Sequence, residues 1–253
     1  MSASPWIRSP RPVPNARIRL LCVPHAGGGP SFFARWLTEV SPAVEVCLVH
    51  LPGREARFGE PPLDDLREIA AHVTAATIPL LDKPVALFGH SMGALVAYEV
   101  ANRLPRGPMH LFVSGSQPPH QPAAAPSIAD LPDGAFLKRV RDGYAGIPDS
   151  LWENEELLRL VLPVLRADFA ACERYEWREH PPLRCDISAL CGEGDYYVPE
   201  QALTGWGDLT SGVCTTSVVG QGHFNLASAR GAVQELVRER LGLVPAMEGA
   251  RRD

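Results

Sequence analysis

Residues 85–94 read VALFGHSMGA, an apolar run of four residues that leads into a Gly-x-Ser-x-Gly pentapeptide. A helix-like run, residues 94–104, comes directly after the pentapeptide. A strand that turns sharply into a helix needs glycine on both sides of the turn, because the backbone there is crowded and strained. Such a turn lifts the hydroxyl of Ser91 out of the sheet and places it at a helix N-terminus, where free N–H groups stabilise negative charge. The stretch therefore predicts that Ser91 is a nucleophile.

Strand-like and helix-like segments alternate on either side of this turn. The expected strands are short apolar runs that suit buried parallel strands, at residues 18–23, 44–51, 85–88, 109–113, 185–191 and 213–219. The expected helices have apolar residues at helical spacing, at residues 32–40, 66–81, 92–104 and 226–241. This alternation is typical of βαβ units, so the chain is predicted to have an α/β fold, with a mostly parallel central sheet and helices on both faces.

One long segment interrupts the alternation. Residues 117–126 are rich in proline and alanine, and from residue 132 to about 178 apolar residues recur at helical intervals. A helical insertion after a strand of a parallel sheet predicts a lid over the C-terminal ends of the strands, where sites of such sheets lie. The expected organisation is a flexible, proline-rich arm at 1–16, a core at 17–116 and 179–244, a helical lid at 117–178 and a flexible tail at 245–253.

The composition excludes several classes of protein. The chain has 253 residues, enough for one large domain, and its net charge of −5 gives no basic footprint for nucleic acid or an anionic membrane. No apolar run approaches the roughly 20 residues that span a bilayer. Residues 1–14 lack the apolar segment of a signal peptide. The six cysteines are scattered without a C-x-x-C pair, which predicts reduced thiols in a cytoplasmic protein rather than disulfides or a metal site.

A serine hydroxyl needs a base to act as a nucleophile near pH 7, and the base needs an orienting acid. In α/β-hydrolases the acid and then the histidine follow the serine along the chain, on loops after late strands. His223 is the expected base, because it is the histidine beyond the insertion that follows a late strand, residues 216–219. Asp195 is the expected acid, in the loop after residues 187–191. Glu193 in the same loop is the alternative, and it lies closer to the strand end.

Two backbone N–H groups are needed near the serine to stabilise a tetrahedral oxyanion. One is expected from Met92, which directly follows the nucleophile. The other is expected from Ala26, in the His25–Gly29 loop (HAGGG) after the first strand, where small residues let the backbone approach a substrate. A simple glycine turn is the alternative for this loop, and His25 is expected to pack it. Six further histidines are expected to be structural or exposed: His50, His72, His90, His110, His120 and His180.

Five motifs together resemble those of a known family. They are Pro24–Gly29 (PHAGGG), Leu51–Glu55 (LPGRE), Gly89–Gly93 (GHSMG), Asp195 three residues before Val198, and Gly222–Phe224 (GHF). In order and spacing they are similar to those of the stand-alone, type II thioesterases that accompany polyketide synthases and nonribosomal peptide synthetases. The resemblance covers about residues 17–241 and implies an α/β-hydrolase fold with a helical lid insertion.

The resemblance also implies an editing function in antibiotic biosynthesis. Such enzymes hydrolyse aberrant or stalled acyl groups from the phosphopantetheine arms of acyl carrier or peptidyl carrier domains. Here Ser91 would take the acyl group, His223 would move the proton and Asp195 would hold the imidazole. The resemblance implies carrier domains and small acyl thioesters as partners, and neither a metal nor a cofactor.

Three departures from the family pattern are expected to tune the pocket. Tyr196 and Tyr197 follow the acid where proline is common, Asn225 stands where an aromatic residue is common, and Gln221 interrupts a pair of glycines. The same triad also fits a serine esterase acting on oxygen esters, or an acyltransferase or chain-releasing thioesterase in which another acceptor replaces water. A non-catalytic protein on this fold is disfavoured, because it would be expected to lack a triad residue.

Clustered cations are the candidate contacts for a carrier domain. Arg35, Arg54, Arg57 and the cluster at residues 138–141 could attract an acidic carrier electrostatically. A solvated surface is the alternative interpretation.

Overall fold

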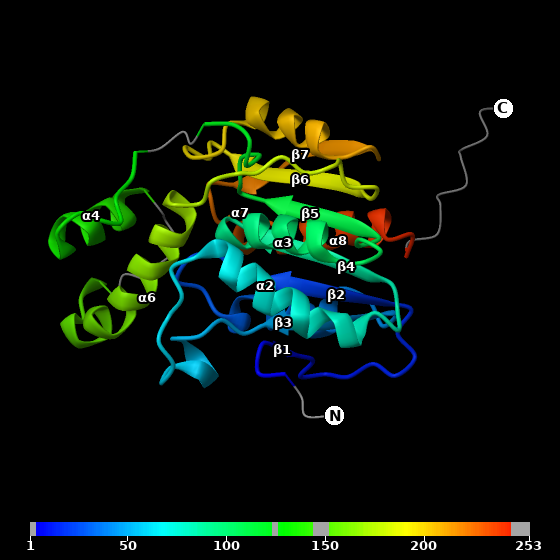
Figure 1. Ribbon diagram of the computed structural model, residues 1–253, viewed down its shortest axis with the longest axis horizontal. Helices are drawn as coiled ribbons and strands as arrows, with labels where there is room; N and C mark the ends of the chain where they lie inside the picture. The colour runs from blue at the N-terminus through cyan, green and yellow to red at the C-terminus, as the bar shows by residue number, and fades with distance from the viewer. Residues whose placement is uncertain (1–3, 123–125, 144–151, 244–253) are drawn as a thin grey trace.

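Seven strands form one sheet in the computed structural model, which describes residues 4–122, 126–143 and 152–243 (Figure 1). The strand order is β1-β3-β2-β4-β5-β6-β7; β1 runs antiparallel to β3, and all other neighbours are parallel. The strands are β1 (Ile7–Arg8), β2 (Ile18–Val23), β3 (Val44–Val49), β4 (Val85–His90), β5 (His110–Ser114), β6 (Asp186–Glu193) and β7 (Cys214–Gln221). The predicted α/β fold with a mostly parallel sheet is confirmed.

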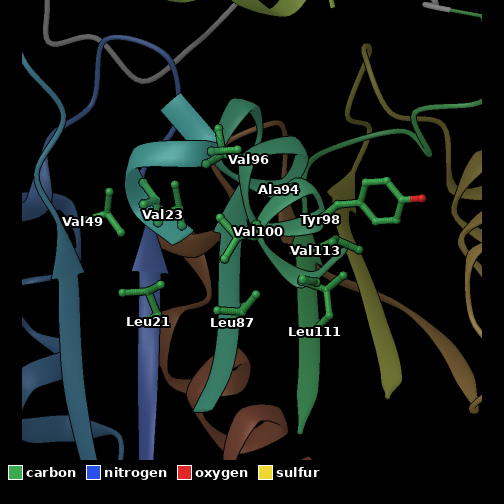
Figure 2. Close-up of a cluster of buried hydrophobic side chains, with 14 of the residues drawn as sticks. Leu21, Val23, Val49, Leu87, Ala94, Val96, Tyr98, Val100, Leu111 and Val113 are labelled. Carbon is green, nitrogen blue, oxygen red and sulfur yellow. The ribbon is translucent and has the colours of Figure 1, made fainter. Parts of the chain in front are cut away.

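Apolar side chains on the central strands alternate between two layers of helices. Leu21 and Leu87 face one side, where they pack with helices α2 (Leu66–Thr77) and α3 (Met92–Arg103) (Figure 2). Leu20 and Phe88 face the other side, toward α1 (Trp36–Glu39) and α8 (Arg230–Arg240). Full burial of one such side chain contributes about 1.5–3 kcal/mol. Helices on both faces explain why these strands are apolar throughout rather than alternating.

The N-terminal arm is partly ordered, which differs from the expectation of a flexible segment over residues 1–16. Ile7 and Arg8 pair with Val49 and Leu48 of β3, and Ile7 is buried against the main core. Trp6 stacks on His72 with ring centroids 4.7 Å apart. Two residues of the arm therefore form an edge strand of the sheet. The expected flexible tail at 245–253 lies outside the described residues.

Several predicted helices are shorter or broken in the structure. The helix expected at 32–40 is a 3₁₀ turn at Pro30–Phe33 followed by α1, and α2 ends in a further 3₁₀ turn at Ile78–Leu80. The last expected helix is divided at Ala229 into α7 (Asn225–Ser228) and α8. The sequence analysis did not predict the 3₁₀ segments at Glu55–Arg57 and Glu200–Leu209.

The insertion contains α4 (Asp133–Gly143) and α6 (Glu155–Glu173), and residues 144–151 between them lie outside the described part. Helix α6 ends five residues before the expected boundary at 178. Both helices lie beyond the sheet, on the side toward which the strand arrows point (Figure 1). They share a small apolar cluster of their own, which includes Phe136, Leu165 and Phe169. The insertion is therefore placed where a site formed by strand-end loops would be covered.

None of the helices in the described ranges combines the length and the apolarity that are needed to cross a membrane.

Candidate active site

Ser91 stands at a strained turn between β4 and α3. Its φ and ψ are 54° and −120°, a conformation that residues other than glycine rarely adopt. The flanking glycines are required by close backbone approach: a Cβ at Gly89 would lie 2.1 Å from the carbonyl oxygen of Gly93. A Cβ at Gly93 would lie 2.2 Å from the carbonyl oxygen of Val23 in β2. The pentapeptide therefore sets the turn and exposes the Ser91 hydroxyl to the loops at the ends of the strands.

The structure brings the three expected triad residues into hydrogen-bond contact. His223 Nε2 lies 2.9 Å from Ser91 Oγ, and His223 Nδ1 lies 3.0 Å from Asp195 Oδ2. The Asp195 side chain is fully buried. Its other oxygen, Oδ1, accepts the N–H groups of Tyr197 at 2.9 Å and Val198 at 3.3 Å. Because the carboxylate is held from both sides, it fixes the plane and the tautomer of the imidazole.

The alternative acid, Glu193, takes no part in this arrangement. It is the exposed last residue of β6, and its backbone carbonyl accepts the N–H of Gly222 at 2.8 Å. Glu193 therefore secures the loop that carries His223, while Asp195 supplies the carboxylate.

The two expected oxyanion donors line the same cavity as Ser91 and His223. Met92 is the first residue of α3, and the N–H groups of a helix's first turn have no partner within the helix. Ala26 follows β2, in a loop whose next two N–H groups are both occupied. The N–H of Gly27 donates to Asp168 Oδ2 at 2.6 Å, and that of Gly28 donates to the carbonyl of His25 at 3.0 Å.

The cavity beside the triad has a volume of about 860 Å³ and lies between the strand-end loops and the insertion. Its walls away from the triad are largely apolar, with Leu95 from α3, Val140 from α4, and Val161, Leu165 and Phe169 from α6. A chamber of this kind suits an apolar chain attached to a carbonyl group at Ser91.

Two histidines lie beside the triad without joining it: His90 is buried, and His25 is half-buried with a buried Nδ1. Burial lowers the pKa of His25 to about 3, and the charges of His223 and Arg54 act in the same direction. Burial, together with His223 and His25, lowers the pKa of His90 well below its usual value. Both rings are therefore neutral near pH 7, which agrees with the expected packing role of His25.

Asn225 lies behind the nucleophile and does not line the cavity, in contrast to the expectation that it tunes the pocket. It is fully buried, and its Oδ1 accepts a hydrogen bond from Ser114 Oγ at 3.3 Å. The carbonyl of Ser114 accepts the N–H of Ser91 at 2.7 Å. The effect of Asn225 is therefore to support the turn that presents Ser91. Of the other departures, Tyr196 is exposed at the cavity rim, and Tyr197 positions Asp195 through its N–H.

Two of the expected surface cations are buried, which corrects the interpretation of Arg54 and Arg57 as docking residues. Arg57 donates to the carbonyl of His50 at 2.8 Å and pairs with Glu60. Arg54 pairs with Asp168, a fully buried residue of α6 that the sequence analysis did not single out. A signal was present, because Asp168 lies next to Phe169 and three residues after Leu165, on the apolar face of a helical pattern.

Within the described residues no group of three or more His, Cys, Asp or Glu side chains is arranged to hold a metal ion. The six cysteines are unpaired with one another, and burial raises the pKa of Cys22, Cys47 and Cys191. Thiols with raised pKa values are poor nucleophiles.

Comparison with known proteins gives concordant matches over most of the chain. A family model described as a thioesterase domain matches residues 18–241. The thioesterase PikA5 of Streptomyces venezuelae is 41% identical over 228 residues, which are 87% of this chain and 80% of that protein. The solved structure of BorB, a type II thioesterase from the borrelidin biosynthetic cluster, superimposes with a TM-score of 0.82 at 35% identity, covering 93% of this chain and 97% of BorB. That of YbtT, a type II thioesterase from the yersiniabactin NRPS/PKS biosynthetic pathway, gives a TM-score of 0.81 at 30% identity, covering 92% and 96%.

Proposed function

The chain belongs to the thioesterase family, and from this membership we propose that it is an editing enzyme for carrier-bound acyl groups. It hydrolyses aberrant or stalled acyl groups from the phosphopantetheine arms of carrier domains in polyketide or nonribosomal peptide biosynthesis. The observation that carries the proposal is the hydrogen-bonded set of Ser91, His223 and Asp195, with contacts of 2.9 and 3.0 Å, at the edge of a largely apolar cavity. The similarity of the chain to type II thioesterases supports the choice of a carrier-bound acyl thioester as the substrate.

In the first half of the reaction the acyl group moves to the enzyme. Ser91 Oγ attacks the thioester carbonyl carbon while His223 Nε2 takes the hydroxyl proton. The carbonyl oxygen becomes an oxyanion, which the N–H groups of Ala26 and Met92 stabilise. When the tetrahedral intermediate collapses, the C–S bond breaks, and His223 returns the proton to the leaving thiolate. The products are a free phosphopantetheine thiol and an ester on Ser91.

In the second half water replaces the thiol. His223 removes a proton from a water molecule, whose oxygen attacks the ester carbonyl. Collapse breaks the bond to Ser91 Oγ, His223 gives the proton back to the serine, and the carboxylic acid leaves. Asp195 orients the imidazole in both halves and stabilises the imidazolium that forms each time.

The insertion is proposed to act as a lid that limits which acyl chains enter. Helices α4 and α6 contribute much of the apolar wall, so they define the length and width of the chamber. Four exposed cations remain from the expected docking set once Arg54 and Arg57 are placed in the interior: Arg35, Lys138, Arg139 and Arg141. They are proposed to face the acidic carrier domain, and a rim contact of this kind affects the association rate more than the affinity.

The test is hydrolysis of acyl-loaded carrier protein by the wild type and by Ser91→Ala, with acetyl or propionyl groups compared with longer chains. Release of short acyl groups that depends on Ser91 supports the editing thioesterase. If the wild type leaves the acyl carrier intact yet cleaves simple oxygen esters, the function is that of an esterase. If an amine or hydroxyl acceptor is acylated in place of water, the chain is a transferase or chain-releasing enzyme.

A further inference from the structure

Asp168 is a buried acid that connects the insertion to the core. It lies on α6, and its side chain is fully buried, as is nearly all of Arg54. Arg54 makes a bidentate contact with this carboxylate: Nη1 donates to Oδ2 at 2.6 Å and Nη2 donates to Oδ1 at 2.8 Å. The N–H of Gly27 also donates to Oδ2, at 2.6 Å. One carboxylate thus joins three segments that are far apart in the sequence.

These contacts determine the orientation of the loop that carries the proposed oxyanion donor. The Ala26 N–H belongs to the peptide group whose carbonyl is that of His25, and this carbonyl accepts the N–H of Gly28 at 3.0 Å. The carbonyl of Gly28 in turn accepts Arg54 Nη1 at 3.2 Å. Asp168 holds the next peptide group, between Ala26 and Gly27, because its Oδ2 accepts the Gly27 N–H. Arg54 and Asp168 therefore hold the peptide groups on both sides of the turn, so that the Ala26 N–H has one orientation.

Packing from the same helix completes the restraint. Gly27 has a φ of +74°, and a Cβ at this position would lie 2.4 Å from Leu165 Cδ2. Leu165 is one helical turn before Asp168, so a single face of α6 covers the loop and bonds to it.

Stability alone does not account for this ion pair. Burying two charges carries a desolvation cost that the attraction between them roughly offsets, so apolar residues would serve a core as well. An apolar pair could not supply this geometry, in which the two side chains form a bidentate pair and the carboxylate also accepts the backbone N–H of Gly27.

We propose that Asp168 and Arg54 are positioning residues for the oxyanion loop, and that the C-terminal half of α6 is a built-in wall of the active site rather than a moving part of the lid. The proposal rests on the proposed function only through the chemistry at Ser91, since any acyl transfer through this serine forms the same oxyanion. Neither residue touches the substrate. Each acts through the Gly27 and Gly28 peptide groups on the direction of the Ala26 N–H.

The test compares Asp168→Asn with the wild type on two substrates, the acetyl thioester of N-acetylcysteamine and p-nitrophenyl acetate. A trifluoromethyl ketone serves as the probe of oxyanion binding, because Ser91 adds to it and generates a tetrahedral oxyanion. We expect kcat to fall on the order of 10²-fold on both substrates, and the Ki of the ketone to rise by a similar factor. KM is expected to change less than about threefold, because the lost interaction forms in the transition state.

The matched control is Glu99→Gln. Glu99 is also a fully buried carboxylate with a bonded arginine, Arg103, and it accepts Tyr175 Oη at 2.6 Å, but it does not line the cavity or contact the oxyanion loop. This variant is expected to lower Tm as Asp168→Asn does, while kcat and the Ki of the ketone stay within about twofold of the wild type. If it changes them as much as Asp168→Asn does, the effect is one of general destabilisation and the proposal is wrong.

A double variant keeps the test decisive if Asp168→Asn does not fold. Arg54→Gln combined with Asp168→Asn leaves no unpaired charge in the interior, and it is expected to show the same losses in kcat and ketone affinity. Wild-type kcat and Ki in either folded variant would overturn the proposal, as would a fall in kcat with an unchanged Ki. Failure of the wild type on the thioester, with Ser91-dependent cleavage of p-nitrophenyl acetate, would overturn the thioesterase function and leave the positioning test intact.

Discussion

His223 is the residue that contacts both other members of the proposed triad. Its ring is held in one orientation, because Ser91 Oγ lies 2.9 Å from one nitrogen and Asp195 Oδ2 lies 3.0 Å from the other. The catalytic roles proposed for these residues are therefore separable by substitution, since each change leaves the other contact in place.

Replacing Ser91 by alanine removes the nucleophile and little else. We expect Ser91→Ala to lower kcat by on the order of 10³-fold or more, with Tm unchanged or raised. Alanine retains a Cβ, so the strain of the turn stays, and a higher Tm would come from the loss of a half-buried polar hydroxyl. The measurement is single-turnover hydrolysis of an acyl carrier together with a thermal melt, and retained activity would show that another group is the nucleophile.

Asp195 and Glu193 can be distinguished by a matched pair of amide substitutions. Asp195→Asn presents an amide to His223 Nδ1 and favours the wrong tautomer, so we expect kcat to fall by up to roughly 10⁴-fold. Glu193→Gln alters an exposed side chain at the end of β6, and its expected effect is within about threefold. A larger loss for Glu193→Gln than for Asp195→Asn, measured as kcat on the same thioester, would reassign the acid.

The contacts among Ser91, His223 and Asp195 could be predicted from the sequence, because each of these residues follows a recognisable strand. The roles of Arg54, Arg57 and Asp168 could not be predicted. The sequence around a charged residue does not show which residue it will pair with after folding. Arg54 and Asp168 are 114 residues apart in the chain, yet they form a bidentate pair. Asp168 could be noticed only as an acid on an apolar helical face, without any indication of what it binds.

At the scale of single elements, the turn between β4 and α3 depends on two close backbone approaches. A Cβ at Gly93 would lie 2.2 Å from the carbonyl oxygen of Val23, and neither atom belongs to a flexible side chain that could move away. We expect Gly93→Ala to lower the free energy of unfolding by more than about 2 kcal/mol. Gly231→Ala is the matched control, because a Cβ there meets no atom within 4 Å and the residue lies in α8.

The control is expected to stabilise the protein, by up to about 1 kcal/mol, because alanine favours a helix over glycine. Urea unfolding of both variants gives the two free energies. Equal effects for the two substitutions would mean that the turn can relax around the new methyl group, and that the two glycines are not needed for it.

Helix α6 can be tested as the element that limits the acyl chain. Val161 lines the cavity, so Val161→Trp fills part of the chamber and is expected to lower kcat/KM for an octanoyl thioester at least about tenfold more than for the acetyl thioester. Leu157→Trp is the control, an exposed position one turn earlier on the same helix and outside the cavity lining. An equal loss for both chain lengths with Val161→Trp would argue that α6 supports the fold and does not limit the acyl chain.

Periodicity predicted the existence and order of the main elements, whereas their ends and breaks escaped it. The last helix is interrupted at Ala229, whose φ of −131° leaves the helical region, yet the apolar spacing continues through that position. Strand β1 was missed because two residues are too short for any pattern, and its pairing with β3 depends on a segment about forty positions away. Such features are decided by tertiary packing, which overrides local preference.

For the molecule as a whole, histidines whose pKa values are lowered in the fold make folding sensitive to acid. Burial lowers the pKa of His25 to about 3 and that of His110 to about 4, from an ordinary value of 6.5. Below pH 6.5 these histidines bind protons in the unfolded chain but not in the folded chain. The free energy of unfolding therefore decreases as the pH falls toward the lowered pKa values. Each such histidine contributes a slope of at most about 1.4 kcal/mol per pH unit.

His110 offers a clean test, because it lies in β5, is hydrogen-bonded to Ser188 Oγ at 2.9 Å and does not line the cavity. The free energy of unfolding of the wild type is expected to fall between pH 6.5 and pH 4, and that of His110→Asn to fall less steeply over this range. Urea titrations at successive pH values give both slopes. Parallel slopes for the two proteins would show that His110 does not resist protonation in the folded state.

The residues proposed to act on one acyl group stand at positions 26, 91, 195 and 223 of a 253-residue chain. They meet only because β2, β4, β6 and β7 lie in one sheet, and within the described residues β6 and β7 are the last two strands along the chain. A growing polypeptide on the ribosome therefore cannot assemble the proposed constellation until β7 and His223 have been made. A translation product that stops before the end of β7 lacks His223, and with it the base of the proposed triad.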